Sequence, residues 1–214
     1  MAYKKSGERR EAILGAASRL FAERGYYEVG VGDIAREAGL GRASVYYYFA
    51  DKEAIARALY DSIVDRIYAA TARALAGRED LFLGILVDYI LLFRHVALNR
   101  SVQAVYYDLA RFADYDAGNI ERLERTVFRR ARRLSAERGV RLSERALVAK
   151  IVTSDAFAKA LFKAIGSGIL QLSFEEAVDY FFRRIILPDA PLPEAEYRRK
   201  LKEALRLCEG IELG

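Results

Sequence analysis

The sequence predicts an all-α protein, and three features carry that prediction. Apolar residues recur at the i, i+3, i+4, i+7 spacing of one helix face through most of the 214 residues. Gly25, Gly39 and Gly77 stand where such stripes end, which is typical of helix C-termini. Residues 45–49 are rich in residue types that favour β-strands, but no second segment of this kind lies close enough in the sequence to pair with them as a β-hairpin.

The first predicted helix covers residues 8–24 and ends before Gly25. Its apolar stripe consists of Ile13, Ala16, Ala17, Leu20 and Phe21. We expect this helix to pack across the next two as the third member of a small core. The four basic residues near its start either approach a phosphate backbone or lie on a solvated, frayed terminus; they are Lys4, Lys5, Arg9 and Arg10.

Residues 31–49 fit two short helices joined by a tight corner. The first, residues 31–38, carries its apolar stripe on Val31, Ile34, Ala35 and Ala38. Gly39 is expected to end this helix in the left-handed conformation, and Gly41 to free the backbone for the next one. A three-residue corner containing glycine is the geometry of a helix-turn-helix, whose second helix enters the major groove of DNA.

The second short helix is predicted over residues 42–48. Val45 and Phe49 point back toward the first helix, and the opposite face consists of Arg42, Ala43, Ser44, Tyr46 and Tyr47. Such side chains bond base edges, touch thymine methyl groups and donate to phosphate oxygens. Propensity alone favours an edge strand for this tyrosine-rich run, but both flanks have helical patterns and packing overrides propensity over so few residues.

A long helix is predicted to follow, with Asp51 as its N-cap and Leu75 near its end. Lys52 in its first turn is a predicted phosphate contact. Further helices follow from Arg78 onward, and the one over residues 81–95 is apolar almost all round, as in a central helix. Helices over residues 147–165 and 174–187 have broad apolar faces. The three prolines at positions 188, 191 and 193 end one helix and open a last one, with Pro193 in its first turn.

Composition excludes several classes of site. With one cysteine, Cys208, and one histidine, His95, the chain has no disulfide framework and no zinc-ligand spacing, so we expect no metal and no other cofactor. No carboxylate pair, nucleophile–base set or phosphate loop indicates an enzyme. Residues 81–93 are interrupted by Asp88 and too short to span a bilayer, and the basic N-terminus lacks an apolar segment. We therefore expect a cytoplasmic protein without a membrane partner.

The net charge of +5 does not by itself indicate DNA binding. Residues 1–52 contain nine basic and seven acidic residues, whereas residues 117–150 contain ten and four. The excess positive charge therefore lies outside the predicted helix-turn-helix. The expectation of double-stranded DNA as a partner rests on the exposed face of residues 42–48.

Seven short blocks of sequence carry a family resemblance. They are Ala16-Ala17, Leu20-Phe21, Gly25-Tyr26, Asp33-Ile34-Ala35, Ala38-Gly39-Leu40, Ser44-Val45-Tyr46-Tyr47-Tyr48-Phe49 and Asp51-Lys52-Glu53. In content and spacing, over about residues 8–60, they resemble the N-terminal domain of TetR-family transcriptional regulators. Gly30 and Gly41 replace capping threonine and serine residues of that family, and Gly32 replaces a polar or basic residue, so phosphate contacts from these positions are in doubt.

The resemblance implies a domain organisation. Residues 1–52 form the helix-turn-helix domain, and residues 53–214 form a helical domain that binds a small-molecule effector and dimerises. The effector pocket is expected among Tyr89, Phe93, Tyr106, Tyr107, Phe112 and Phe157, with His95 as a polar anchor, although each aromatic is alternatively plain core. The predicted homodimer interface consists of Phe157, Leu161, Val178, Phe181 and Phe182.

The sequence therefore predicts a DNA-binding transcriptional regulator. The favoured form is a homodimeric repressor that a small, largely apolar effector releases from a near-palindromic operator. The glycines at both cap positions motivate an alternative, a regulator of the same build that has lost DNA reading and acts as a protein adaptor. A helical enzyme is the least favoured class.

Overall fold

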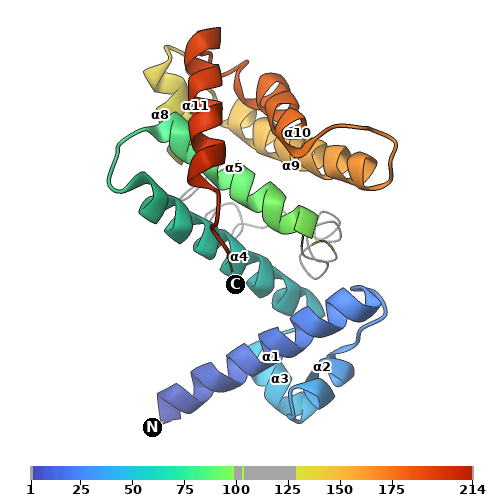
Figure 1. Cartoon of the computed structure of the whole chain (residues 1–214). Coiled ribbons are helices and arrows are strands. Elements are labelled where there is room, and N and C mark those ends of the chain that lie inside the picture. The colour runs from blue at the N-terminus through green and yellow to red at the C-terminus, as the bar shows by residue number, and fades with distance from the viewer. Residues whose placement is uncertain (1, 99–102, 104–128, 214) are drawn as a thin grey trace. The chain divides into compact units, whose positions relative to one another are not determined.

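The computed structural model describes residues 2–98, 103 and 129–213, and every regular element among them is a helix (Figure 1). The elements are α1 (Ala2–Arg24), α2 (Val31–Glu37), α3 (Arg42–Tyr48), α4 (Lys52–Leu75), α5 (Leu81–Leu98), α8 (Arg129–Glu137), α9 (Glu144–Gly166), α10 (Phe174–Phe181), η2 (Phe182–Ile186) and α11 (Glu194–Leu207). The all-α prediction is confirmed, including the helical state of the tyrosine-rich run in α3.

The chain divides into two compact units. The N-terminal unit comprises residues 1–66 and a segment that begins at Arg94; the C-terminal unit comprises residues 67–93 and the C-terminal part of the chain. The division falls inside α4, later than the predicted boundary at residue 52. The reason is packing, because Ile55 and Ala56 in the first half of α4 are buried in the core of the N-terminal unit.

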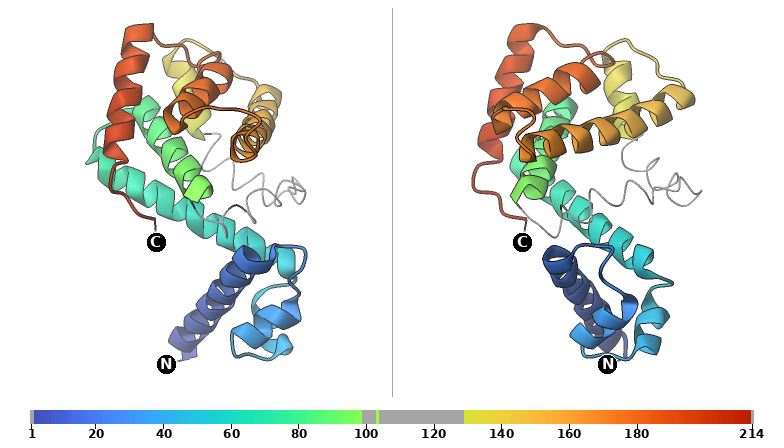
Figure 2. Two further views of the ribbon diagram at one scale, coloured as in Figure 1. Left: turned by 45° about the vertical axis from the view of Figure 1, so that its right-hand side comes forward. Right: turned by 90° about the vertical axis from the view of Figure 1, so that its right-hand side faces the viewer.

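Helices α1, α2 and α3 lie together in the N-terminal unit (Figure 2), and side chains from all three share one core. The predicted stripe of α1 is buried along its length, with Ile13, Ala16, Ala17 and Phe21 fully inaccessible. Ile34 of α2 and Val45 of α3 are buried in the same cluster. Burying side chains of this size stabilises the folded state by about 1.5–3 kcal/mol each, so the orientation of α3 is fixed by apolar packing beneath it.

The corner between α2 and α3 is a Schellman C-cap. The Leu40 N–H donates to the Ala35 carbonyl over 2.8 Å, and the Gly39 N–H donates to the Arg36 carbonyl over 3.1 Å. Gly39 has φ +67°, the left-handed conformation that glycine adopts without steric cost. Gly41 has φ −76° and ψ 152°, which any residue adopts. The expectation that Gly41 supplies backbone freedom is therefore wrong.

In the C-terminal unit, α5 is the central helix, as its sequence predicts. Its residues Phe82, Leu86 and Val87 are at most 1% exposed. Asp88 is the polar exception: it accepts from the Thr71 hydroxyl over 2.6 Å and pairs with Arg130, so it ties α4, α5 and α8 together. Burial raises the pKa of Asp88, while the Arg130 charge and the Thr71 hydrogen bond oppose the shift.

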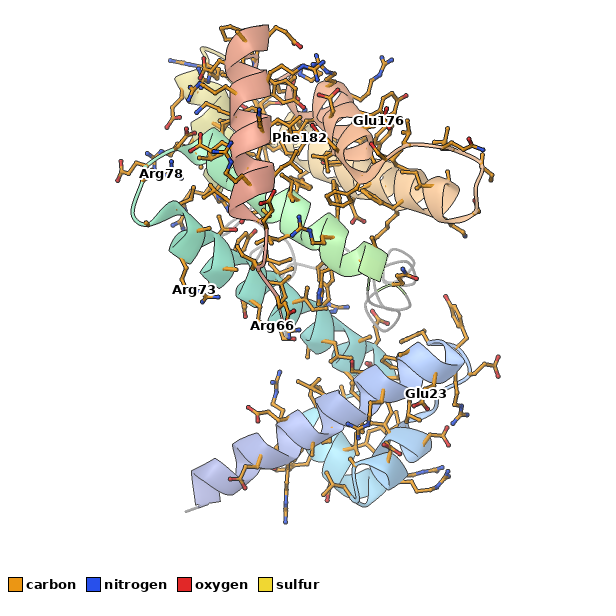
Figure 3. All side chains as sticks on the ribbon, viewed as in Figure 1. Glu23, Arg66, Arg73, Arg78, Glu176 and Phe182 are labelled. Atoms are coloured by element: carbon orange, nitrogen blue, oxygen red, sulfur yellow. The ribbon has the colours of Figure 1, made fainter. Side chains whose placement is uncertain are left out.

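The helix predicted over residues 174–187 is not uniform. It is α-helical to Phe181 and then continues as the π-helical turn η2, where the Leu187 N–H donates to the Phe182 carbonyl over 2.9 Å. Arg183 of this turn makes a bidentate pair with Glu194 at 2.7 and 3.0 Å, which joins η2 to α11. Phe182, labelled in Figure 3, lies inside the unit against Phe82 and Tyr89.

Further polar contacts and caps complete this unit. Arg78, also labelled in Figure 3, pairs with Glu203 of α11 at 2.6 Å. Pro193 is the N-cap of α11 and lies just before the helix, not in its first turn as the sequence predicted. The buried Cys208 caps its C-terminus, as expected of a core residue. None of the described helices is long and apolar enough to cross a bilayer.

The two corner glycines respond differently to the same substitution. We expect Gly39→Ser to lower the free energy of unfolding by roughly 1–2 kcal/mol, because an L side chain is strained at positive φ. Gly41→Ser is the matched control and should be neutral or stabilising by a few tenths of a kcal/mol, since serine is the better N-cap. Urea unfolding followed by circular dichroism checks both. Equal losses at the two positions would contradict the difference in backbone conformation.

Candidate nucleic-acid interface

The outward face of α3 is open to solvent. Arg42, Ala43, Tyr46 and Tyr47 are exposed and Ser44 is half-buried, while Val45 on the inner face is 1% exposed. Tyr47 is 80% exposed, unusual for so large an aromatic side chain, and its ring meets Tyr48 edge-on at 5.0 Å. The residues predicted to read DNA thus share one exposed surface on a helix held rigidly from beneath.

The N-terminus of α2 is capped by a carboxylate in place of a hydroxyl. The N-cap residue is Gly30, and its N–H donates to Oδ2 of Asp33 over 3.0 Å. Oδ1 of the same carboxylate pairs with Arg36 at 3.3 Å. The Gly30 N–H is the main cause of the lowered pKa of Asp33, and the charges of Arg24 and Arg36 lower it further. Half of a capping box therefore survives the missing side chain.

Lys52 has a partner within the chain. Its Nζ donates to the Tyr26 carbonyl over 2.8 Å and lies 4.2 Å from the centre of the Tyr26 ring. These contacts hold the loop between α1 and α2 against the start of α4, where Asp51 accepts from the Ala54 N–H over 2.7 Å as the predicted N-cap. The role of Lys52 at a phosphate stays a prediction, and binding there competes with the Tyr26 carbonyl.

The basic residues of α1 differ in their surroundings. The Arg10 guanidinium lies 5.3 Å from the centre of the Phe49 ring, at the end of α3, while Arg9 is exposed. The side chains of Lys4 and Lys5 lie outside the described residues. Of the two members of this group whose side chains are described, Arg10 therefore lies beside the end of α3.

Two further residues of this region, Tyr27 and Gly32, have surroundings that the sequence pattern did not predict. Tyr27 is 52% exposed in the loop before α2 and meets Tyr26 edge-on at 5.4 Å. Gly32 underlies the Arg42 side chain, and an ideal Cβ there would lie 2.6 Å from Arg42 Nε. The sequence shows that residue 27 is a tyrosine but not that its side chain is exposed, and no sequence pattern predicts the close contact between α2 and α3.

Comparison with known proteins places this helix-turn-helix in a family. Residues 13–59 match the model for bacterial regulatory proteins of the TetR family. The transcriptional regulator EthR of Mycolicibacterium smegmatis is 42% identical over 62 residues, or 28% of this chain and 29% of that protein. EthR of Mycobacterium tuberculosis is 35% identical over 106 residues, or 46% of this chain and 49% of that protein. The matches span half or less of the length of these relatives. Its helix-turn-helix domain is therefore of the TetR-family type.

The TetR fold extends through the C-terminal unit. The structure of RolR in complex with resorcinol matches 99% of this chain and 99% of RolR with a TM-score of 0.61, at 18% sequence identity. A likeness at this identity shows the fold alone. The matched family model is that of regulatory proteins, and the relatives are named as transcriptional regulators, with no catalytic activity. Within the described residues, no group of three or more His, Cys, Asp or Glu side chains is placed to hold a metal ion.

The residues predicted to line the effector pocket fall in different places. Tyr89, Phe93 and Phe157 belong to one aromatic cluster in the C-terminal unit, all within 6.2 Å of the Phe181 ring. Burial raises the pKa of the Tyr89 hydroxyl, and nearby Tyr68 and Asp155 raise it further. Phe93 is fully buried, as in plain core. Tyr106, Tyr107 and Phe112 lie outside the described residues.

His95 belongs to the N-terminal unit. Its Nε2 is buried and has no hydrogen-bond partner among the described residues. Burial lowers the pKa of His95, and the charge of Arg66 lowers it further, so the imidazole is neutral near pH 7. A neutral imidazole with an unused nitrogen keeps the capacity to bond one ligand atom.

Four of the five residues predicted at the dimer interface are buried within the chain itself, and the interface assignment stays a prediction. Leu161 is 4% exposed, and Val178, Phe181 and Phe182 are fully buried within the chain itself. Their side chains pack inside the C-terminal unit, Phe181 and Phe182 against each other and against Tyr89. Phe157 remains half-buried, with its ring stacked on Tyr180 at 5.9 Å. Periodicity identified an apolar face but did not distinguish a subunit core from a subunit interface.

The Asp33 cap makes the stability of this domain depend on pH. The pKa of Asp33 is lowered by folding, so its contribution is present above the ordinary value of about 4 and is lost as pH falls through the lowered value. We expect Asp33→Ala to lower the Tm at pH 7 and to differ less from the parent at pH 3. Glu11→Ala, which changes an exposed acid of α1, is the control. A Tm difference for Asp33→Ala that stays constant between pH 7 and pH 3 would rule out the carboxylate cap.

Proposed function

We propose that this TetR-family chain is a DNA-binding transcriptional regulator that acts from the cytoplasm as a homodimeric repressor. A small, largely apolar effector releases it from a near-palindromic operator. The observation that carries the proposal is the exposed face of α3, which presents Arg42, Ala43, Tyr46 and Tyr47 to solvent above a buried apolar core.

The chemistry of this face suits a major groove. A guanidinium bonds guanine edges or phosphates, an alanine methyl touches thymine, and tyrosine hydroxyls bond phosphates or bases. Exposing two large aromatic side chains to water has no folding benefit, whereas a groove would cover them. We favour this role over a protein adaptor, since α2 and α3 both form with glycine at the N-cap, and at Gly30 the Asp33 carboxylate accepts the backbone N–H.

Tyr47 provides the direct test of this face. We expect Tyr47→Ala to weaken binding to the duplex that the parent protein selects from a random pool by about fivefold or more, or roughly 1 kcal/mol. The Tm should be unchanged, because the side chain is 80% exposed. Ile169→Ala, at a 78% exposed position of the C-terminal unit, is the control. Normal binding by Tyr47→Ala would refute the DNA-reading role, and a parent protein that selects no duplex would favour the adaptor.

The proposed effector is a small molecule with an apolar or aromatic body. The aromatic cluster around Tyr89, Phe93 and Phe157 in the C-terminal unit supports this class, as does resorcinol bound to RolR, a protein of the same fold. An effector acts only through its different affinity for the DNA-bound and released arrangements. Screening small phenols for release of the selected duplex examines this part of the proposal.

The proposed dimer uses the exposed side of α9 in place of its buried side. A stripe of small and apolar residues faces solvent along this helix: Ala149, Val152, Thr153, Ala156 and Ala160. Exposed Tyr180 of α10 adds an aromatic side chain, stacked on Phe157 of α9. Small side chains allow the helices of two copies to approach closely around a two-fold axis. Two copies present two α3 helices to half-sites about 34 Å, or a multiple of that distance, apart.

A bulky charge in the α9 stripe should separate the two subunits. We expect Ala156→Arg to be monomeric at concentrations where the parent protein is dimeric, because the stripe would have to bury an unpaired guanidinium. Ala195→Arg places the same side chain at an exposed alanine of α11 and should remain dimeric. Sedimentation velocity measures both. A dimeric Ala156→Arg variant, or a monomeric parent protein, would contradict the assignment.

A further inference from the structure

Gly32 occupies a position where glycine is costly. It lies in the first turn of the seven-residue helix α2, where glycine is about 1 kcal/mol less favourable than alanine. Its φ is not in the left-handed region that would require glycine. A short helix beside the exposed face of α3 therefore carries a destabilising residue without a backbone reason for it.

The space above Gly32 is filled by the Arg42 side chain of α3. An ideal Cβ on Gly32 would lie 2.6 Å from Arg42 Nε, 2.8 Å from Cζ and closer still to Nη2. Distances below 3.0 Å are essentially never adopted by a real Cβ, and no other described glycine has a neighbour this close. Three guanidinium atoms crowd the same point, so the group lies across the bare Cα. Any side chain at position 32 would displace it.

Electrostatic contacts do not account for the place of Arg42. It has no hydrogen bond or ion pair with any described residue. The nearby acids are engaged elsewhere, Asp33 with Gly30 and Arg36, and Glu37 with Arg19 at 3.0 Å. The guanidinium is therefore placed by shape, and its N–H donors stay available to an acceptor outside the protein.

We infer that Gly32 is a positioning residue for Arg42. Because Gly32 has no side chain, the Arg42 guanidinium can lie against the start of α2. A single acceptor group on the duplex, either a phosphate oxygen or the edge of a guanine, then meets a cation that is already in place. Pre-placement reduces the side-chain entropy lost on binding. The inference rests on the proposed DNA binding and assigns to α2 a part in aiming the recognition helix.

A double-mutant cycle with Gly32→Ala and Arg42→Ala tests the inference on the selected duplex. We expect each single variant to bind about 5- to 10-fold more weakly than the parent, within the range of one specific contact. The double variant should bind no more weakly than Arg42→Ala, because Gly32 acts through Arg42. Additive losses, or parent-like binding by Gly32→Ala, would overturn it. If Arg42 contacts a phosphate, Arg42→Ala should weaken the salt dependence of the affinity for duplexes of every sequence. If Arg42 contacts a guanine, the same variant should lose its preference at one base pair.

Two further measurements separate positioning from folding. Gly32→Ala should keep or raise the Tm, since alanine favours the helix, as should the control Gly15→Ala in α1, whose nearest neighbour to an added Cβ is 3.6 Å away. Only Gly32→Ala should weaken DNA binding. Without DNA, ¹⁵N relaxation of Arg42 Nε should show a restrained side chain in the parent and a mobile one in Gly32→Ala. Equal mobility overturns the inference even if the protein binds DNA, whereas a parent that selects no duplex overturns the proposed function first and the inference with it.

Discussion

Apolar packing beneath α3 is the constraint on which the rest of this molecule depends. Ile34 and Val45 are buried against the stripe of α1, and Ile55 of α4 enters the same core. Because the inner side of α3 is held in this way, its outer side has a fixed direction and its polar and aromatic residues form one surface. A recognition helix needs such support, since a groove can be read only by side chains whose positions are set before contact.

Two glycines at which the helix-turn-helix departs from the TetR-family pattern have a side chain of the same motif close by. Gly30 lacks a capping hydroxyl, but the Asp33 carboxylate accepts its N–H and restores half of a capping box. Gly32 weakens α2, yet the space above it holds the Arg42 guanidinium. Each of these glycines is unfavourable for the helix or its cap, and each is in contact with a side chain from elsewhere in the motif. Departures of this kind from local sequence preferences are common at functional sites.

The C-terminal unit combines a dense aromatic core with a few buried polar contacts. The rings of Tyr89, Phe93 and Phe181 pack within 5.5 Å of one another, and the π-helical turn after Phe181 begins with Phe182, which is also fully buried. Asp88 is satisfied by Thr71 and by Arg130. The side chains of Asp88 and Arg130 are 12% and 29% exposed, so the pair is partly shielded from water, and these contacts specify how α4, α5 and α8 meet.

The sequence by itself determined the helical class, the helix-turn-helix and the bounds of α3, because helical periodicity and glycine placement are local properties of the chain. It also determined that Val45 lies inside and Tyr47 outside. Tertiary structure alone decided that Phe181 and Phe182 belong to the subunit core, that Lys52 contacts the Tyr26 carbonyl, and that Arg42 lies over Gly32. These outcomes depend on which elements meet across long stretches of chain, and a one-dimensional pattern records which face of a helix is apolar without recording what covers it.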